Sequence, residues 1–461
     1  MIGLFGIVLA LGLLIYLAYR GASVLVVAPI MALVAAGFSL APGLATYTQV
    51  FMPATGRFIV TYFPLFLLGA IFGRLMDTSG SAAAIADGIV ERLGPAQAIP
   101  AVVLACAVLT YGGVSLFVVA FAIYPVAEAL FRAADIPKRL IPATIALGAF
   151  TFTMTAMPGT PAIQNAIPMP YFGTTPFAAP GLGLIAAAIM AGAGLGWLLY
   201  RKRQAGIAGE GFGLHPGSAR AAPDAEPGPR PPFWLAGLPI LVVISLNYVL
   251  SVHLFPALDT SYLAEPRYGA TTIAEVRGIW SIIVALTVAI LLILLTNLPR
   301  IAPQKDIGDG ASAAVLPIFN TASLVGFGAV VAALPAFAMV SEAVESVGGG
   351  PLVSLALSTN LLAGLTGSAS GGMSIALEAL GDRYLEQGMA AGISPDLLHR
   401  VTTIATGGLD SLPHNGAVIT LLGICGLTHR ESYGDIAVVA VLAPLAALVA
   451  VIALGSAFGS F

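Results

Sequence analysis

The chain has 461 residues, of which 58% belong to the hydrophobic set and only 9% are charged, and its formal net charge is −3. An ordinary soluble domain carries about 25% charged residues, so a chain this apolar cannot cover a water-facing surface of its own size. The charges are spread over many loops and make no basic face, which argues against a nucleic-acid partner.

Apolar runs long enough to cross a lipid bilayer recur along the chain, since a transmembrane helix needs about 20 apolar residues. Such runs occupy residues 1–19, 22–40, 58–76, 182–200, 233–251, 278–298 and 436–454. They do not alternate apolar and polar residues, and a backbone in lipid must satisfy its own hydrogen bonds, so helices are expected rather than a barrel. The predicted fold class is an all-α polytopic protein embedded in membrane lipid.

The first 200 residues are predicted to contain scaffold helices and one structural repeat. Residues 1–57 form the N-terminal scaffold, and we expect the first run to be retained because no basic residue precedes it and no small-residue cleavage site follows. Residues 58–200 form the first repeat. Within it, residues 96–131 are too long for one span and are interrupted by glycines, which indicates a re-entrant hairpin. Residues 139–171 are predicted to form a helix broken by prolines.

A polar linker and two scaffold helices are predicted next. Residues 201–232 begin with three basic residues and are rich in Gly, Pro and Ala, which indicates a flexible cytoplasmic linker. Residues 233–298 supply the scaffold helices. Following the crossings outward from the linker predicts ten spans and two hairpins, with both termini outside. The same path places Arg383 and Arg400 at the outer face and His399 in a loop.

The last part of the chain, residues 315–457, is predicted to repeat the organisation of the first repeat. It should contain a re-entrant hairpin at residues 351–388 and a broken helix at residues 397–427. By the crossing count the two repeats start on opposite sides of the membrane, so they are inverted. Inverted repeats with discontinuous helices place their ligand near the midplane, where the repeats meet.

The repeat is visible as a constant spacing of motifs. At an offset of 256 residues, Gly94 aligns with Gly350 and Thr110 aligns with Thr366, each within the same Gly-Pro or Leu-Thr pair. Small residues follow both threonines. A proline break follows 48 residues after Thr110 and 47 residues after Thr366. A hairpin tip followed by a broken helix is therefore expected in both halves.

The hairpin tips and broken helices are the predicted substrate site. A broken helix presents free N–H groups at one stub and free C=O groups at the other, and these groups attract an anion and a cation respectively. Four breaks converging on one cavity would bind a small organic anion without a buried arginine. The candidate substrate-binding residues are Thr110, Gly112, Gly113, Ser115, Gly159, Thr160, Gln164, Asn165, Thr366, Ser368, Ser370 and Asn415.

Two ionisable residues in the second break are candidates for energy coupling. Asp410 lies in a break with apolar flanks, and charged groups at such depth are rare and point to function. His414 follows four residues later and can exchange a proton near neutral pH. Proton coupling through this pair is the preferred hypothesis. Sodium coupling stays open, because Ser and Thr hydroxyls with free carbonyls also suit Na⁺.

These motifs resemble the gluconate permease (GntP) family of transporters. Residues 157–162 (MPGTPA) are similar to that family's proline-rich break, residues 367–370 (GSAS) to its hairpin tip, and residues 410–416 (DSLPHNG) to its second break. The similarity in segment order extends over the whole chain. At Gly159 and Thr160 the family's histidine is missing, which favours the branch that resembles hydroxybutyrate and short-carboxylate permeases over gluconate itself.

The resemblance implies a secondary active transporter, usually a proton symporter, that works as a homodimer in the bacterial inner membrane. We also expect an elevator-type mechanism, in which hairpins and broken helices move against a scaffold. An enzyme is not expected: no Cys and His cluster has zinc spacing, no lysine follows the glycine-rich tips, and no cofactor or metal is indicated. An anion channel is the weaker alternative, because two gates at opposite faces suit a transporter better.

Overall fold

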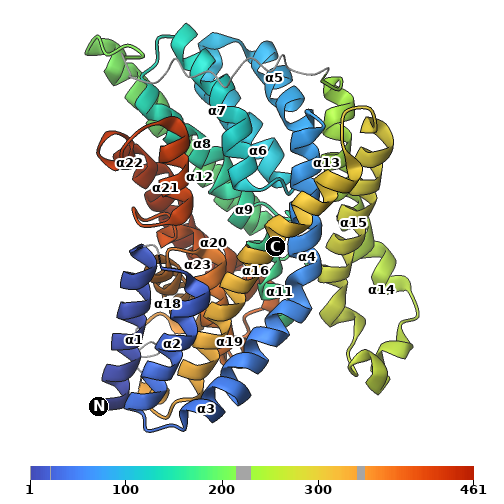
Figure 1. The fold of residues 1–461 in the computed structure, drawn as a ribbon, viewed down its shortest axis with the longest axis vertical. Coiled ribbons are helices and arrows are strands. Elements are labelled where there is room, and N and C mark those ends of the chain that lie inside the picture. The colour runs from blue at the N-terminus through green and yellow to red at the C-terminus, as the bar shows by residue number, and fades with distance from the viewer. Residues whose placement is uncertain (1, 21, 214–229, 340–347) are drawn as a thin grey trace.

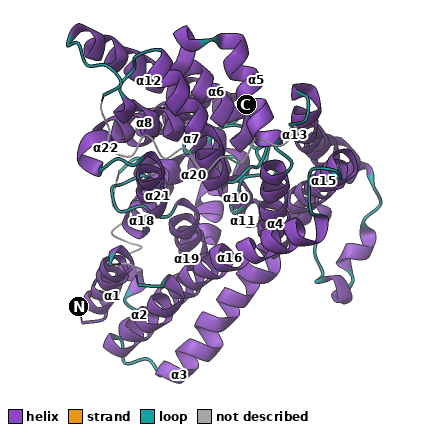
Figure 2. Ribbon diagram, turned by 45° about the horizontal axis from the view of Figure 1, so that its top comes forward, coloured by secondary structure: helices purple, strands orange, loops and turns teal. Residues whose placement is uncertain are grey.

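The computed structural model describes residues 2–20, 22–213, 230–339 and 348–461. Within these ranges the chain folds into helices joined by turns and loops, and the described residues form no strand (Figure 2). Helices satisfy their backbone hydrogen bonds internally, as lipid requires. The predicted all-α fold class is therefore confirmed.

The N-terminal helices pack against the middle of the chain. Helix α1 (Ile2–Tyr19) packs on α2 (Val24–Phe38), and a short turn, α3 (Gly43–Ala45), leads through a π-helical turn at Thr46–Phe51 into α4 (Met52–Thr78). The long helix α4 lies along α16 (Figure 1).

The first repeat continues from α4 with a series of short helices. Helix α6 turns back into α7, and the stretch from α8 to α11 is repeatedly interrupted. The elements are α5 (Ser81–Leu93), a 3₁₀ turn (Pro95–Gln97), α6 (Ala98–Tyr111), α7 (Leu116–Ala133), a 3₁₀ turn (Lys138–Leu140), α8 (Ile141–Ala149), α9 (Phe152–Thr155), α10 (Ile163–Ala166), α11 (Pro168–Phe172) and α12 (Pro180–Ile207).

Three helices, with several short turns between the first two, make up the middle. Helices α13 and α15 pack against each other, and α15 also contacts α4. The elements are α13 (Phe233–Tyr248), a π-helical turn (Val249–Leu254), α14 (Phe255–Ala257), 3₁₀ turns at Ser261–Ala264 and Pro266–Tyr268, α15 (Ile273–Asn297) and α16 (Pro303–Ala333).

The second repeat has the same order of a hairpin and then a broken helix. Helix α18 packs against both α19 and α20. The elements are α18 (Gly350–Thr366), α19 (Ala369–Ala390), α20 (Pro395–Leu409), α21 (Gly416–Cys425), α22 (His429–Ala437), a π-helical turn (Val438–Leu442) and α23 (Ala443–Phe458). Figure 1 shows α6 and α7 in the upper half of the molecule and α18 and α19 in the lower half, as inverted repeats require.

Seven helices in the described chain are long and apolar enough to cross a membrane, or eight if the bent pair α5 and α6 counts as one span. The two members of that pair meet at 108°. The seven are Gly43–Thr78, Leu116–Ala133, Pro180–Ile207, Phe233–Ala257, Ile273–Asn297, Pro303–Ala333 and His429–Phe458. This count includes only long continuous helices, so it cannot include a span made of short or broken helices. The count of ten crossings therefore stays a prediction.

The linker begins later than its composition suggests. The basic residues expected to open it continue α12 to Ile207. Beyond the helix, Arg139 holds Glu210 by two hydrogen bonds of 2.7 and 2.8 Å, which lower the pKa of Glu210. The Phe212 N–H donates to Asp135 at 3.0 Å. Residues 201–207 thus continue a helix, Glu210 and Phe212 contact the first repeat, and residues 214–229 of the expected linker lie outside the described residues.

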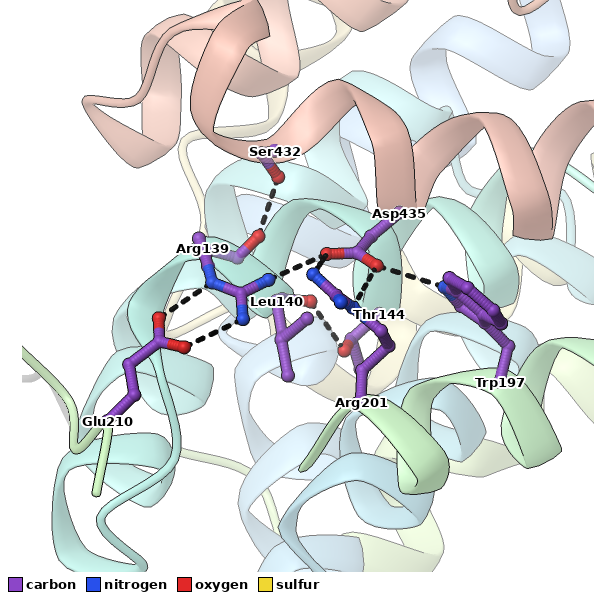
Figure 3. Close-up of polar contacts among 8 residues, drawn as sticks. All are labelled: Arg139, Leu140, Thr144, Trp197, Arg201, Glu210, Ser432 and Asp435. Atoms are coloured by element: carbon purple, nitrogen blue, oxygen red, sulfur yellow. Dashed lines mark hydrogen bonds and ion pairs between the residues drawn. The ribbon is translucent and has the colours of Figure 1, made fainter. Parts of the chain in front are cut away.

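One carboxylate ties this end of α12 to α22 (Figure 3). Asp435 is only 4% exposed and lies between Arg139, at 3.0 Å, and Arg201, at 2.8 Å. The indole of Trp197 donates to the same carboxylate at 2.9 Å. Two cations and one indole therefore share one buried anion, which joins the start of α8, the end of α12 and α22.

We expect Asp435→Asn to destabilise the protein by roughly 3 kcal/mol, because two arginines would lose their shared buried counter-ion. The melting temperature of the purified protein in detergent measures this loss. Asp259→Asn is the matched control, since Asp259 is an exposed loop residue whose carboxylate accepts from the Ser261 N–H at 3.0 Å. Equal melting temperatures for the two variants would contradict the assignment.

Candidate functional site

The tip of the first hairpin, residues 112–115, is docked onto the first broken helix. Gly113 has φ +94°, and a Cβ at this position would lie 2.8 Å from Pro161, so the close approach requires glycine. The hydroxyl of Tyr111, the last residue of α6, donates to the Pro158 carbonyl at 2.7 Å. The hairpin tip and the break therefore form one unit.

The first break, residues 156–162, satisfies its backbone internally. The Gly159 N–H donates to the Pro176 carbonyl at 2.8 Å. The side-chain amide of Asn165 donates to the carbonyls of Thr160, at 3.0 Å, and Pro176, at 2.9 Å. Asn247 from α13 donates to the Gly159 carbonyl at 3.1 Å. Asn165 and Thr160 are fully buried, so both hold the break together from inside.

The second hairpin tip, residues 367–368, is joined in the same way to the second break, residues 410–415. The Asn415 amide donates to the carbonyls of Gly367, at 2.9 Å, and Asp410, at 2.6 Å. Its oxygen accepts from the Ala417 N–H at 2.6 Å and so begins α21. The His414 ring lies 2.9 Å from the Gly364 carbonyl. In both halves a hairpin tip and a break are linked by side-chain hydrogen bonds.

One hydrogen bond recurs at equivalent positions of the two breaks. The spacing that aligns Pro158 with Pro413 also aligns Thr160 with Asn415. The Thr160 hydroxyl accepts from the N–H two residues later, at 3.3 Å, as the Asn415 amide oxygen does. Thr160 thus accepts a hydrogen bond at the position where Asn415 does, although only Asn415 is the N-cap of the helix that follows. The shared contact supports the repeat inferred from motif spacing.

A cavity of about 640 Å³ opens beside the first hairpin tip. Its walls come from the tip, the first break, α4 and α16. Four of the predicted substrate-binding residues line it: Thr110, Gly113, Ser115 and Gln164. Near one end Arg74 pairs with Asp309 at 3.1 Å.

The other candidates do not line this cavity. Gly112 packs against Ile240, and Gly159 packs against Phe177. Thr160 and Asn165 lie inside the break. Five second-half candidates are brought together around the second tip and break: Thr366, Ser368, Asp410, His414 and Asn415. Ser370 lies two residues after Ser368, in the first turn of α19. All four breaks were expected to converge on one cavity. This cavity is lined by the first tip and the first break, and the second tip and break do not reach it.

Asp410 ends α20 as a buried carboxylate, 6% exposed. The Ser411 hydroxyl donates to Asp410 Oδ1 at 3.1 Å, and no ion pair to Asp410 is found in the part of the chain described. A buried acid held by a hydroxyl, without a cation, can take up a proton. Its role in coupling stays a prediction.

Arg400 is a residue of the first break's surroundings that the sequence did not single out. It was expected at the outer face, and it is fully buried in α20, where it contacts the first break. Its guanidinium donates to the Ala156 carbonyl at 3.2 Å and to the Ala178 carbonyl at 2.6 and 3.0 Å. The Ala156 carbonyl has no helical hydrogen-bond partner because α9 ends there. The Ala178 carbonyl lies in the loop just before α12. The site thus does contain a buried arginine, which compensates the carbonyl side of the break.

His399, expected in a loop, is also fully buried in α20. One ring nitrogen lies 2.6 Å from the Thr174 hydroxyl and the other 3.2 Å from the Asn165 amide oxygen. Helix α20 of the second repeat therefore supports the break of the first. The sequence could have indicated this site, because His399 and Arg400 are adjacent in an apolar half of the chain. Ionisable residues in such a region are energetically unfavourable unless they are paired inside the protein.

The comparisons with known proteins define the class. No protein-family model matches the chain. It resembles the YdaH transporter of Alcanivorax borkumensis in structure, with a TM-score of 0.58, 16% identity, and coverage of 90% of this chain and 89% of the other. At that identity the likeness shows a shared fold. With its long apolar helices, the protein is a multi-pass membrane protein.

The chain is also 46% identical over 446 residues to the uncharacterized transporter YxjC of Bacillus subtilis (strain 168), and the match covers 94% of each chain. The protein therefore belongs to the same transporter family as YxjC.

Arg400→Met should lower the free energy of unfolding by roughly 3–5 kcal/mol, because it leaves the Ala156 and Ala178 carbonyls unpaired inside the protein. Thermal unfolding in detergent measures the effect. Arg267→Met is the control, since the Arg267 side chain is 68% exposed, pairs with Glu265 and lies over the Tyr268 ring. An unchanged melting temperature for Arg400→Met would refute the assigned role.

Proposed function

We propose that the protein is a secondary active transporter that imports a small carboxylate or hydroxy acid together with protons. The observation that carries the proposal is the pair of inverted hairpin tips, each hydrogen-bonded to a broken helix, the first of them beside a cavity against α4 and α16. The resemblance to gluconate permeases supports the substrate class, the bacterial inner membrane as location and a homodimer as the assembly.

The coupling residues in this proposal are Asp410 and His414. Asp410 is buried beside the Ser411 hydroxyl, and His414 lies on the Gly364 carbonyl of the hairpin. Protonation of either group changes the charge of the second break. That break is hydrogen-bonded to the second hairpin tip. Protonation of Asp410 or His414 would therefore change the strength of the contact between the break and the tip.

Sodium coupling is the second candidate, and one observation favours it. Four buried side-chain oxygens on α18, α19 and α20 lack a hydrogen-bond partner among the described residues: Thr359 Oγ1, Asn360 Oδ1, Ser374 Oγ and Thr406 Oγ1. Oxygen ligands of this kind suit a hard cation. The two candidates differ in which ion gradient drives uptake.

Transport by this fold requires the site to face each side of the membrane in turn. The cavity has two kinds of wall, the tip and break of the first repeat and the long helices α4 and α16. We place the boundary of the moving unit between these walls. The hairpins and broken helices would then move together against α4, α13, α15 and α16.

Uptake of labelled 3-hydroxybutyrate, lactate and gluconate into proteoliposomes tests the coupling. With an inward proton gradient and no sodium, one acid should accumulate, and a protonophore should abolish accumulation. Asp410→Asn should lose accumulation but keep counterflow exchange, because exchange needs no net proton movement. Glu386→Gln, which changes an exposed carboxylate of α19, is the control. Accumulation only after sodium is added would refute proton coupling.

Two disulfides test the boundary of the moving unit in a cysteine-free background. A Cβ at Gly73 of α4 would lie 3.6 Å from the Ser115 backbone nitrogen, so oxidising Gly73→Cys with Ser115→Cys should lock the first hairpin and stop transport. A Cβ at Gly407 would lie 3.6 Å from Thr155 Cβ, within disulfide reach. This second pair lies inside the unit, so its oxidation should leave transport intact. The reverse pattern would place the boundary elsewhere.

A further inference from the structure

The N-terminus of α7 opens into the cavity without a cap. Helix α7 is 18 residues long, and its N-cap, Ser115, makes no side-chain capping bond. The first hydrogen bond within the helix runs from the Val119 N–H to the Ser115 carbonyl at 2.9 Å. The three residues between them line the cavity, and their N–H groups have no partner among the described residues. These N–H groups and the helix dipole attract negative charge.

The equivalent stubs of the second half are capped by their own side chains. Ser368 accepts from the Gly371 N–H at 3.1 Å at the start of α19. Asn415 caps α21 in the same way. The second hairpin tip and the second break are therefore satisfied internally, whereas the helix that follows the first tip is not. The open N–H groups of α7 are left for a ligand.

Thr110 is the second, independent observation. Its side chain is 3% exposed and lines the same cavity, and Thr110 Oγ1 has no hydrogen-bond partner in the described structure. Buried hydroxyls are nearly always hydrogen-bonded. A free hydroxyl beside an open helix N-terminus presents donors that a carboxylate can accept.

The rest of the cavity has a different character. Its walls are mainly apolar, with Leu65 and Phe66 of α4, Met154 and Ile163 beside the break, and Pro317 of α16. The arginine near its end, Arg74, is already paired with Asp309. An apolar chain would be buried against these walls, whereas the hydroxyls of a polyhydroxy acid would be left without hydrogen-bond partners.

We propose that the carboxylate of the transported acid binds at the N-terminus of α7 and accepts a hydrogen bond from Thr110, while its apolar chain lies against α4 and α16. The substrate is then a monocarboxylate with an apolar chain and not a polyhydroxy acid. This assignment rests on the proposed function and adds the orientation and chemical class of the substrate.

Ligand-induced thermal shifts of the purified full-length protein at pH 7 test it, with butyrate, acetate, gluconate and butyramide as probes. Butyrate should stabilise the protein at concentrations at least tenfold below gluconate. Butyramide has the same chain without the charge and should not stabilise it. Equal shifts with gluconate and butyrate would overturn the assigned class.

Two variants separate the two ends of the site. Thr110→Val removes the hydroxyl and should weaken butyrate and acetate about tenfold, the effect of one hydrogen bond to a charged group. Gly69→Val projects into open space in the cavity, since no atom lies within 4 Å of its Cβ position, and should weaken butyrate more than acetate. Thr287→Val, on an exposed face of α15, is the control.

The outcomes distinguish this assignment from the proposed function. If carboxylates bind but neither Thr110→Val nor Gly69→Val alters their affinity, the orientation is wrong and carboxylate transport stands. If none of the three carboxylates stabilises the protein, the substrate class of the proposed function fails, and this assignment fails with it.

Discussion

Backbone groups that leave a helix inside a membrane find no water there, so each freed N–H and C=O needs a partner from the protein. This constraint accounts for the side chains at both breaks. Asn165 and Asn415 are used as internal bridges, and each donates to two carbonyls. The prolines and glycines allow the helix to break. The asparagines then supply hydrogen bonds to the backbone carbonyls that the break leaves without partners. Where a group stays unsatisfied, as at α7, the structure leaves room for a ligand.

The two repeats share this solution but have diverged in what they leave open. The second hairpin begins α19 with a capped N-terminus, whereas the first begins α7 uncapped beside Thr110. The second break carries the buried acid Asp410, and the first carries no ionisable residue between residues 156 and 162. Substrate and coupling ion would accordingly bind in different halves. Their linkage then depends on contacts between the halves.

Such contacts are present and are made by helix α20. Arg400 and His399 reach from the second repeat to the carbonyls and the Asn165 amide of the first. Because a buried arginine is stable only with all its donors used, this contact fixes the two breaks relative to each other. A change of charge at Asp410, at the end of the same helix, could therefore reach the first break through a rigid element. The Asp435 cluster does the same for the far end of α12.

Hydropathy, motif spacing and the placement of Pro and Gly were enough to predict the helical membrane class, the inverted repeat and both hairpin tips and breaks, because these features act locally. They also predicted Thr110, Ser115 and Gln164 as substrate-binding residues, and these three line the cavity. The burial of Arg400 and His399, the pairing of Glu210 with Arg139, and the inward orientation of Thr160 and Asn165 became visible only in the folded chain. These outcomes depend on which segments meet across more than 200 residues of chain, as Asn165 and His399 do, and local pattern carries no information on that pairing.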